Sequence, residues 1–179
     1  MFASSTLSTL PLFFLLLLLP ITNATIDETC KAASASHYLV DYDICTTSLQ
    51  ANPNSETANP KDLALIGAQL CLNNATSTVT KTNDMIKNGN FSLRAKEILK
   101  KCANEVFNDE IYWLSDAIDW LKKGSYTDAL DDIGEVRAMA YDCDDLFDEK
   151  GEYDPLKEEQ VDMDDLSNLA LFLVDRLRG

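Results

Sequence analysis

The sequence CANEVFNDEIYWLSDAIDWLKKGSYTDALDDIGEVRAMAYDC, residues 102–143, carries the clearest helical pattern in the chain. Its apolar residues recur at steps of three and four, which is the spacing of amphipathic α-helices. Gly124 interrupts the pattern, and Ser125 followed by Asp128 resembles a capping box that begins a helix. The stretch therefore predicts two helices joined by a short connection, which makes them antiparallel neighbours.

The same pattern extends in both directions. The first of these helices is predicted to run from Ser92 to about Lys123, long enough to be kinked or split, and the second to end at Gly151. The apolar stripes consist of Ile98, Leu99, Cys102, Val106, Phe107, Trp113, Leu114, Ala117, Ile118 and Leu121 in the first helix, and of Ala129, Ile133, Val136, Ala140, Cys143 and Phe147 in the second.

Two further helices flank this pair. The sequence Asn59-Pro60-Lys61-Asp62 has an N-cap, a proline at the first helical position and an early acid, so it predicts a helix that reaches about Lys87. The sequence Asp154-Pro155 is predicted to begin the last helix. The apolar face expected for that helix consists of Val161, Leu166, Leu169, Ala170, Leu173, Val174 and Leu177.

Four long amphipathic helices with short connections predict an all-α fold, an up-down-up-down four-helix bundle over about residues 59–178. Two shorter helical segments, about 27–37 and 42–51, precede it and form a predicted hairpin over about 25–52. The turn-rich sequence ANPNSETANP, residues 51–60, joins the two parts. A chain of this length suits a single domain.

Residues 1–24 are predicted to be a secretory signal peptide. Leu12 to Leu19 form an apolar run that is shorter than the roughly 20 residues of a membrane span. Small residues at Thr22 and Ala24 indicate cleavage after Ala24, although no Lys or Arg occurs in the first eleven residues. We therefore expect a secreted protein, residues 25–179, located outside the cell and not in a membrane.

Five cysteines are present: Cys30, Cys45, Cys71, Cys102 and Cys143. Outside the cell cysteines tend to oxidise, and sequence alone does not select one pairing. Cys30 and Cys45 are the closest pair, Cys102 and Cys143 lie on stripes of neighbouring helices, and Cys71 is expected to be a small buried hydrophobe.

The sequence lacks the usual patterns of catalytic or metal chemistry. His37 is the only histidine, so it cannot form a two-histidine metal site, and no nucleophile elbow, phosphate loop or zinc spacing is present. Many carboxylates lie between Asp142 and Asp165, but an EF-hand aligned on Gly151 would need acids where Leu146 and Lys150 stand. We expect these carboxylates to be solvated on outer helix faces, and we predict no catalytic residue, no metal and no cofactor.

The formal net charge of −15 argues against nucleic acid and anionic membranes as partners and favours a basic protein. Three Asn-x-Ser/Thr sites occur, at Asn23, Asn74 and Asn90. Asn23 falls within the signal peptide, Asn74 must face outward from its helix, and Asn90 lies in the sequence NGNFS between two helices. We predict glycans on Asn74 and Asn90.

Several motifs together resemble the plant invertase and pectin methylesterase inhibitor family. They are Tyr42 and Asp43 before CTTSL, the Gly-x-Tyr-x-x-Ala turn at residues 124–129 between two cysteine-bearing helices, and the Asp154-Pro155 start. The resemblance spans about residues 25–179 and is strongest to pollen members described as invertase inhibitors. It implies a four-helix bundle after a helical hairpin. It also implies disulfides Cys30–Cys45 and Cys102–Cys143, with Cys71 as a free thiol.

The same resemblance implies a proteinaceous inhibitor that binds a cell-wall carbohydrate enzyme, one to one, and covers its active-site cleft in the apoplast. Invertase inhibitors of the family carry Pro-Lys-Phe where this chain has Tyr126, Thr127 and Asp128. Lys122 and Lys123 stand nearby and are candidate substitutes, so the candidate target contacts are Lys122, Lys123, Tyr126 and Thr127. Because the motif is absent, we expect pectin methylesterase in preference to acid invertase.

Two other hypotheses remain open from the sequence. The first is a secreted helical binding or regulatory protein that has lost enzyme targeting. The second is an enzyme that uses its carboxylates and His37.

Overall fold

The computed structural model describes residues 25–38 and 40–178, and these residues form helices and connections without a β-strand. The predicted signal peptide, with its cleavage point after Ala24, lies outside the described residues. In chain order the elements are α1 (Ile26–Ser34), α2 (Tyr42–Gln50), η2 (Ser55–Thr57), α3 (Pro60–Asn88), α4 (Leu93–Lys101), η3 (Cys102–Val106), α5 (Phe107–Lys123), α6 (Tyr126–Met139), α7 (Asp142–Asp148) and α8 (Lys157–Asp175).

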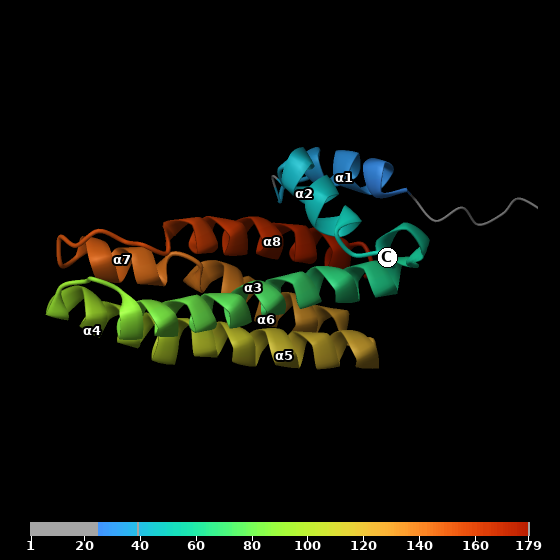
Figure 1. Ribbon diagram of the computed structural model, residues 1–179. Coiled ribbons are helices and arrows are strands. Elements are labelled where there is room, and N and C mark those ends of the chain that lie inside the picture. Colours follow the sequence, from blue (N-terminus) through green and yellow to red (C-terminus); the bar gives the residue numbers. More distant parts are fainter. Residues whose placement is uncertain (1–24, 39, 179) are drawn as a thin grey trace, which may run out of the picture.

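Over residues 60–175 the chain passes four times along the long axis of the bundle (Figure 1). Helix α3 runs in one direction, α4 to α5 return, α6 and α7 run forward again, and α8 returns. Helix α3 packs against α5 and α8, and α6 packs against the same two helices. The predicted up-down-up-down bundle is therefore confirmed.

Helix α3 begins and ends as its sequence predicts. The Asn59 side chain accepts a hydrogen bond from the Asp62 backbone N–H (2.9 Å), and Pro60 occupies the first turn, where its missing N–H costs nothing. The helix ends at Asn88, within the predicted NGN break. Its start and end are thus set by local chemistry.

The second pass is continuous but contains a π-helical turn. Residues Cys102 to Val106 form the π segment, and the Phe107 N–H donates to the Cys102 carbonyl. A π turn accommodates an extra residue within a helix and shifts the face that follows it. The sequence predicted that this long helix could be kinked or split, and the π turn is the interruption that the structure shows.

The third pass differs from the single helix predicted over 125–151. It breaks at Ala140 and Tyr141 into α6 and α7. The two helices pack in different hydrophobic clusters: Ile133 and Val136 lie in the larger cluster, whereas Cys143 and Phe147 lie in the smaller one. The break allows each helix to orient its apolar side toward its own cluster.

The last helix also starts later than predicted. Residues 154–156 form a turn in which Asp154 is buried and its Oδ1 accepts from the Leu156 N–H (2.8 Å), and α8 begins at Lys157. Val161, expected on the apolar face, is 41 % exposed, whereas Gln160 and Met163 are buried. From residue 167 to 174 every residue of α8 is buried, so this part of the helix is covered on all sides.

In the part of the chain that the structure describes, two hydrophobic clusters fill the bundle. We call the larger one the main core: it includes Leu114, Leu121, Ile133, Leu169 and Val174, together with six residues of the α1–α2 region, Ile26, Cys30, Ala33, Val40, Cys45 and Leu49. We call the smaller one the distal core: it comprises Ala95, Ile98, Leu99, Cys102, Val106, Phe107, Cys143, Phe147 and Leu156. The hairpin of α1 and α2 therefore rests on the bundle as part of the main core.

Candidate functional site

The turn between α5 and α6 is built around a glycine in the left-handed region. Gly124 has φ 82° and ψ 14°, and the Ser125 N–H donates to the Trp120 carbonyl (3.0 Å), which closes α5 in a Schellman-type cap. A Cβ at Gly124 would meet no atom within 4 Å, so the backbone conformation, not space, selects glycine there. Helix α6 follows directly, without the side-chain cap that Ser125 and Asp128 suggest.

The four candidate contact residues lie at this turn but differ in availability. Lys122 Nζ is 3.0 Å from Asp119 Oδ1, and Lys123 Nζ lies 4.5 Å from the centroid of the Trp120 ring. Tyr126 is half-buried against the main core, whereas Thr127 is exposed. Both lysine side chains therefore contact other residues of α5. Thr127 is exposed, and within the described residues its side chain makes no such contact.

A shallow hollow of about 510 Å³ adjoins the turn, and the C-terminal residues Leu177 and Arg178 form one wall of it. Arg178 pairs with Asp175, while Lys61 Nζ donates to the Lys122 carbonyl (2.9 Å) from the start of α3. Sequence reasoning missed Lys61, Leu177 and Arg178 here, because nothing in a linear pattern shows which chain ends meet at one end of a bundle.

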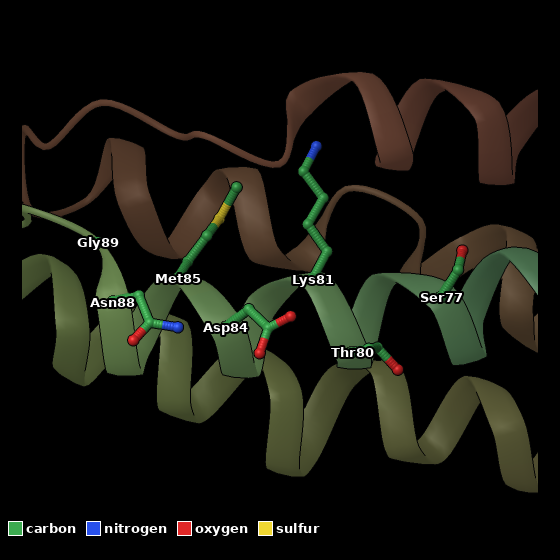
Figure 2. Close-up of a pocket in the computed structure, with 7 residues that line it drawn as sticks. All are labelled: Ser77, Thr80, Lys81, Asp84, Met85, Asn88 and Gly89. Atoms are coloured by element: carbon green, nitrogen blue, oxygen red, sulfur yellow. The ribbon is translucent and has the colours of Figure 1, made fainter.

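A second candidate surface follows the outer side of α3. Figure 2 shows Thr80, Asp84 and Asn88 in a row along one side of this helix, with Ser77 above that row, beside an open groove of about 810 Å³. Lys81 reaches instead toward α8 and pairs with Glu159. The signal for this surface is the sequence STVTKTNDMIKN, in which short polar residues recur at steps of three and four. It presents exposed hydrogen-bonding groups, without a catalytic arrangement.

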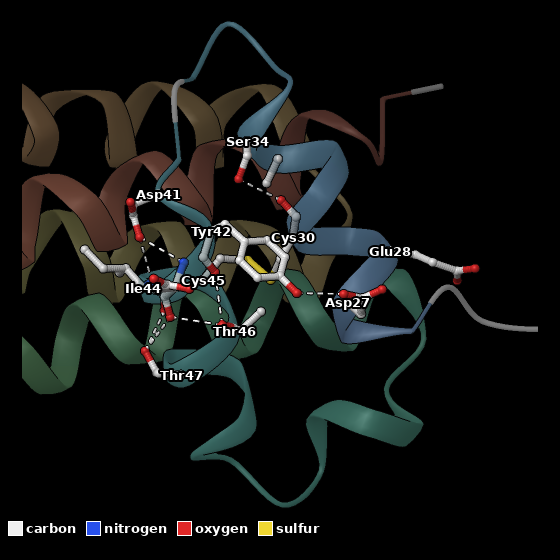
Figure 3. The surroundings of a disulfide bond; sticks show 12 residues. Asp27, Glu28, Cys30, Ser34, Asp41, Tyr42, Ile44, Cys45, Thr46 and Thr47 are labelled. Carbon is white, nitrogen blue, oxygen red and sulfur yellow. Dashed lines mark hydrogen bonds between the residues drawn. A yellow bond between two sulfur atoms is a disulfide. The ribbon is translucent and has the colours of Figure 1, made fainter.

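The N-terminal hairpin is held by a disulfide and by polar contacts around it (Figure 3). Cys30 and Cys45 are bonded, with their Cα atoms 5.6 Å apart. Tyr42 Oη donates to Asp27 Oδ1 (2.6 Å), and Lys31 Nζ contacts the other carboxylate oxygen (2.8 Å). These two hydrogen bonds lower the pKa of Asp27. Tyr42 therefore links the two helices and has a structural role.

The second disulfide and the free thiol lie within the bundle. Cys102 and Cys143 are bonded, with Cα atoms 5.4 Å apart, and this bond ties the π segment to α7. Both pairings are those that the family resemblance implies. Cys71 is fully buried as a free cysteine, and burial raises its pKa to about 12. A thiol in this state is a poor nucleophile.

The two candidate glycan acceptors have different surroundings. Asn74 is half-buried in the middle of α3, and the hydroxyl of Thr76, two residues further on, donates to the Leu72 carbonyl (2.7 Å). Asn90 is exposed in the connection between α3 and α4. The expectation that Asn74 faces outward is therefore met only in part.

No described group of His, Cys, Asp and Glu side chains has the arrangement of a metal site. His37 is exposed in the connection from α1 to α2, stacked beside Tyr38 with ring centroids 4.0 Å apart. The carboxylates between Asp142 and Asp165 are exposed or half-buried, except Asp154, which is buried and accepts from the Gln160 amide. Within the described residues, no helix combines the length and apolarity needed to span a bilayer.

Comparisons with known proteins identify what the chain resembles. The family model described as plant invertase/pectin methylesterase inhibitor matches residues 24–173. A relative from Platanus acerifolia named "Putative invertase inhibitor" is 29% identical over 168 residues, which cover 91% of each chain. A relative of the same name from Platanus orientalis is 26% identical over 156 residues, 85% of this chain and 89% of the relative. The crystal structure of a pectin methylesterase inhibitor from Arabidopsis thaliana has the same fold, with a TM-score of 0.61 at 18% identity; the match covers 84% of this chain and 95% of that one.

Proposed function

Because the chain belongs to the plant invertase/pectin methylesterase inhibitor family, whose members are inhibitors and not enzymes, we propose that it blocks the active-site cleft of a pectin methylesterase. Family membership supports the broader statement that the chain is an inhibitor of either invertase or pectin methylesterase. The choice of pectin methylesterase over acid invertase is the proposal, and it rests on the turn between α5 and α6.

The observation that carries this choice is the identity of the exposed residues at that turn. Thr127 and Asp128 are both exposed. By the family resemblance they take the positions of the lysine and phenylalanine of the invertase-inhibitor motif. A pocket lined by catalytic carboxylates attracts a cation and repels a carboxylate. Asp128 therefore works against binding to such a pocket, and Thr127 brings no compensating charge.

Charge over the whole chain supports the same target, because the resemblance implies pectin methylesterases that are often basic enzymes. A net charge of −15 favours a basic partner and speeds its encounter by long-range attraction. The polar face of α3 at Ser77, Thr80, Asp84 and Asn88 offers the hydrogen-bonding surface needed to cover a cleft. We assign this face as the main contact, and Lys122, Lys123, Tyr126 and Thr127 as flanking contacts.

Acid invertase is the second candidate, because both Platanus relatives are named as invertase inhibitors. Lys122 and Lys123 provide cations within a few residues of the motif position, although Asp119 and the Trp120 ring hold them. Inhibition of invertase would require these side chains to leave those partners and enter the enzyme's pocket.

The proposal includes the compartment and the stoichiometry. Residues 1–24 are proposed to direct export and to be removed, which places the inhibitor in the apoplast with its target. Asn90 is the favoured glycan acceptor, because it is exposed between two helices, and Asn74 is the less accessible one. One inhibitor is proposed to cover one enzyme cleft.

Parallel assays test the proposal. Purified inhibitor at micromolar concentration is added to a pectin methylesterase and to an acid invertase, each at an acidic and a neutral pH. We expect loss of the esterase activity and no loss of invertase activity. A reversed result would assign invertase as the target. Undiminished activity of both enzymes would favour the non-inhibitory binding protein.

A variant at the proposed contact adds a structural readout. Thr80→Arg places a bulky side chain on the polar face of α3 and is expected to weaken esterase inhibition at least tenfold. Thr47→Arg on the exposed side of α2 is the matched control and is expected to inhibit as the wild type does. Equal inhibition by both variants would remove the α3 face from the contact.

A further inference from the structure

The basic residues of this acidic chain are concentrated in one segment. Five of the fifteen Lys and Arg residues occur within residues 87–101, where Glu97 is the only acid. The five are Lys87, Arg94, Lys96, Lys100 and Lys101, and we call them the basic strip. The segment is thus locally positive within a chain whose formal net charge is −15.

Four members of the strip lie on α4, where Arg94, Lys100 and Lys101 are exposed and Lys96 is half-buried. The inner face of this helix buries Ala95, Ile98 and Leu99 in the distal core. At 3.6 residues per turn, the cations at 94, 96, 100 and 101 flank the opposite face on both sides. Figure 1 places α4 at the end of the bundle far from the α1–α2 hairpin.

Most of these charges have no internal partner. Among the residues that the structure describes, Lys101 is the one member of the strip in an ion pair, with Glu105 at 4.0 Å, and both side chains are more than half exposed. A shallow groove of about 330 Å³ between α4 and α7 contains Arg94, Lys101 and Lys150, but also Glu97 and Glu149. Lys96 and Lys100 lie outside this groove.

Two highly exposed apolar side chains lie at the same end of the molecule. Leu93, the first residue of α4, is 85 % exposed, and Tyr153 is 82 % exposed. Ser92 Oγ donates to Glu152 Oε1 (3.1 Å), so the connection that carries Tyr153 lies against the start of α4. An apolar flank beside separated cations is the combination that suits a sugar ring bearing a carboxylate.

We propose that the basic strip binds an acidic polysaccharide, a polyuronate whose free carboxylates pair with Lys96, Lys100 and Arg94. This proposal rests on the proposed function, because a pectin methylesterase hydrolyses esters and leaves free carboxylates on the polymer. The inhibitor would then be retained where its target has already acted. A convex helix carrying flexible lysines fits a linear polyanion with repeated charges better than a shaped protein surface.

The overall negative charge does not prevent this contact. At physiological ionic strength the Debye length is about 8 Å, so acids farther away are largely screened while the strip acts at contact. Binding is expected to weaken as salt rises, because bound cations release counterions from the polymer.

The test measures binding of the full secreted protein to immobilised polygalacturonate at near-physiological salt. Wild type is expected to bind polygalacturonate at least tenfold more tightly than highly methyl-esterified pectin. Lys96→Glu/Lys100→Glu is expected to weaken this binding at least tenfold. Lys31→Glu/Arg176→Glu makes the same change in net charge at exposed positions outside both the strip and the proposed enzyme contacts, and its binding to polygalacturonate is expected to stay within twofold of wild type. Far-ultraviolet circular dichroism confirms that both variants are folded.

The outcomes separate the possible explanations. Equal losses in the two variants would show that net charge, not the strip, governs binding, and would overturn the proposal. Equal binding to both polymers, or to neither, would also overturn it. Esterase inhibition is assayed in the same samples: the strip variant is expected to keep it. Polymer binding without inhibition would contradict the proposed function alone, and inhibition without polymer binding would contradict the strip alone.

Discussion

Glu110 is an ionisable residue inside the bundle, with 1 % of its surface exposed. Burial, with a smaller contribution from the Asp142 carboxylate, raises its pKa to about 8. An unfolded glutamate loses its proton near pH 4.3, so between about pH 4.3 and 8 only the folded state holds this proton. The contribution of Glu110 to the free energy of unfolding is therefore predicted to fall as pH rises through this window, by at most about 1.4 kcal/mol per pH unit.

Glu110→Gln removes this titration while keeping a similar shape. Urea unfolding at about pH 5 and about pH 8 is expected to show a smaller loss of stability in the variant than in wild type. Asp109→Asn, at an exposed neighbouring position, is the control and should follow wild type. Identical pH dependence in all three proteins would contradict the buried state of Glu110.

Two glycines give opposite predictions for the same substitution. Gly124 has a positive φ, so Gly124→Ala is expected to lower the free energy of unfolding by about 1 kcal/mol. Gly134 lies inside α6, and a Cβ added there would meet no atom within 4 Å, so Gly134→Ala is expected to raise it by about 1 kcal/mol. Urea denaturation of both variants checks the pair, and changes of the same sign would contradict the described turn.

Individual positions were predictable where local chemistry dominates and not where packing decides. The Asn59 cap and the glycine at 124 follow from conformational preferences of single residues. Val161 lies on the exposed side of α8, contrary to the sequence-based prediction, because tertiary packing turns Gln160 and Met163 inward. The burial of Glu110 could not be predicted from the sequence, because an acid next to an apolar stripe usually lies at the exposed edge of that stripe.

The α1–α2 hairpin depends on its disulfide because its helices are short. Each has nine residues, below the roughly 12 to 15 that an isolated helix needs in water. Cys30→Ala/Cys45→Ala removes a cross-link across 15 residues, worth about 3 kcal/mol in the chain-entropy model. Hydrogen exchange is expected to accelerate in α1 and α2 while α3 and α5 stay protected.

The other disulfide provides the comparison. Cys102→Ala/Cys143→Ala opens a loop of 41 residues and is expected to cost about 4 kcal/mol, with faster exchange spread over α4, α5 and α7. If the Cys30→Ala/Cys45→Ala variant lost hydrogen-exchange protection throughout the bundle, the stability of the bundle would depend on the hairpin. That result would contradict a purely local role for the Cys30–Cys45 disulfide.

Helix boundaries show how far a linear pattern reaches. Helix α3 was predicted almost to the residue, since a cap, a proline and a glycine-containing break define it. The break between α6 and α7 was missed, because residues 139–142 contain neither glycine nor proline and the cause is a change of hydrophobic cluster. The late start of α8 has the same origin, since Asp154 is used in a buried turn.

The arrangement of the whole molecule followed from connection lengths, because helices joined by short turns pack as antiparallel neighbours. The proposed contact surface did not follow. Polar helix faces look alike in sequence whether they meet water or an enzyme, so the α3 face and the cations gathered near Lys122 emerge only when the helices are placed together. The basic residues within 87–101 can be read from the sequence. Only the structure shows which face of α4 is buried, and therefore which of these residues are left for a partner.

The central claim is that this rigid helical molecule obstructs the cleft of a pectin methylesterase. Its most direct test is a titration of a fixed, micromolar concentration of that enzyme with the purified inhibitor, followed by residual esterase activity. The account predicts a linear fall that ends near one equivalent of inhibitor. Activity that stays constant through a large molar excess of folded, disulfide-bonded inhibitor would contradict it.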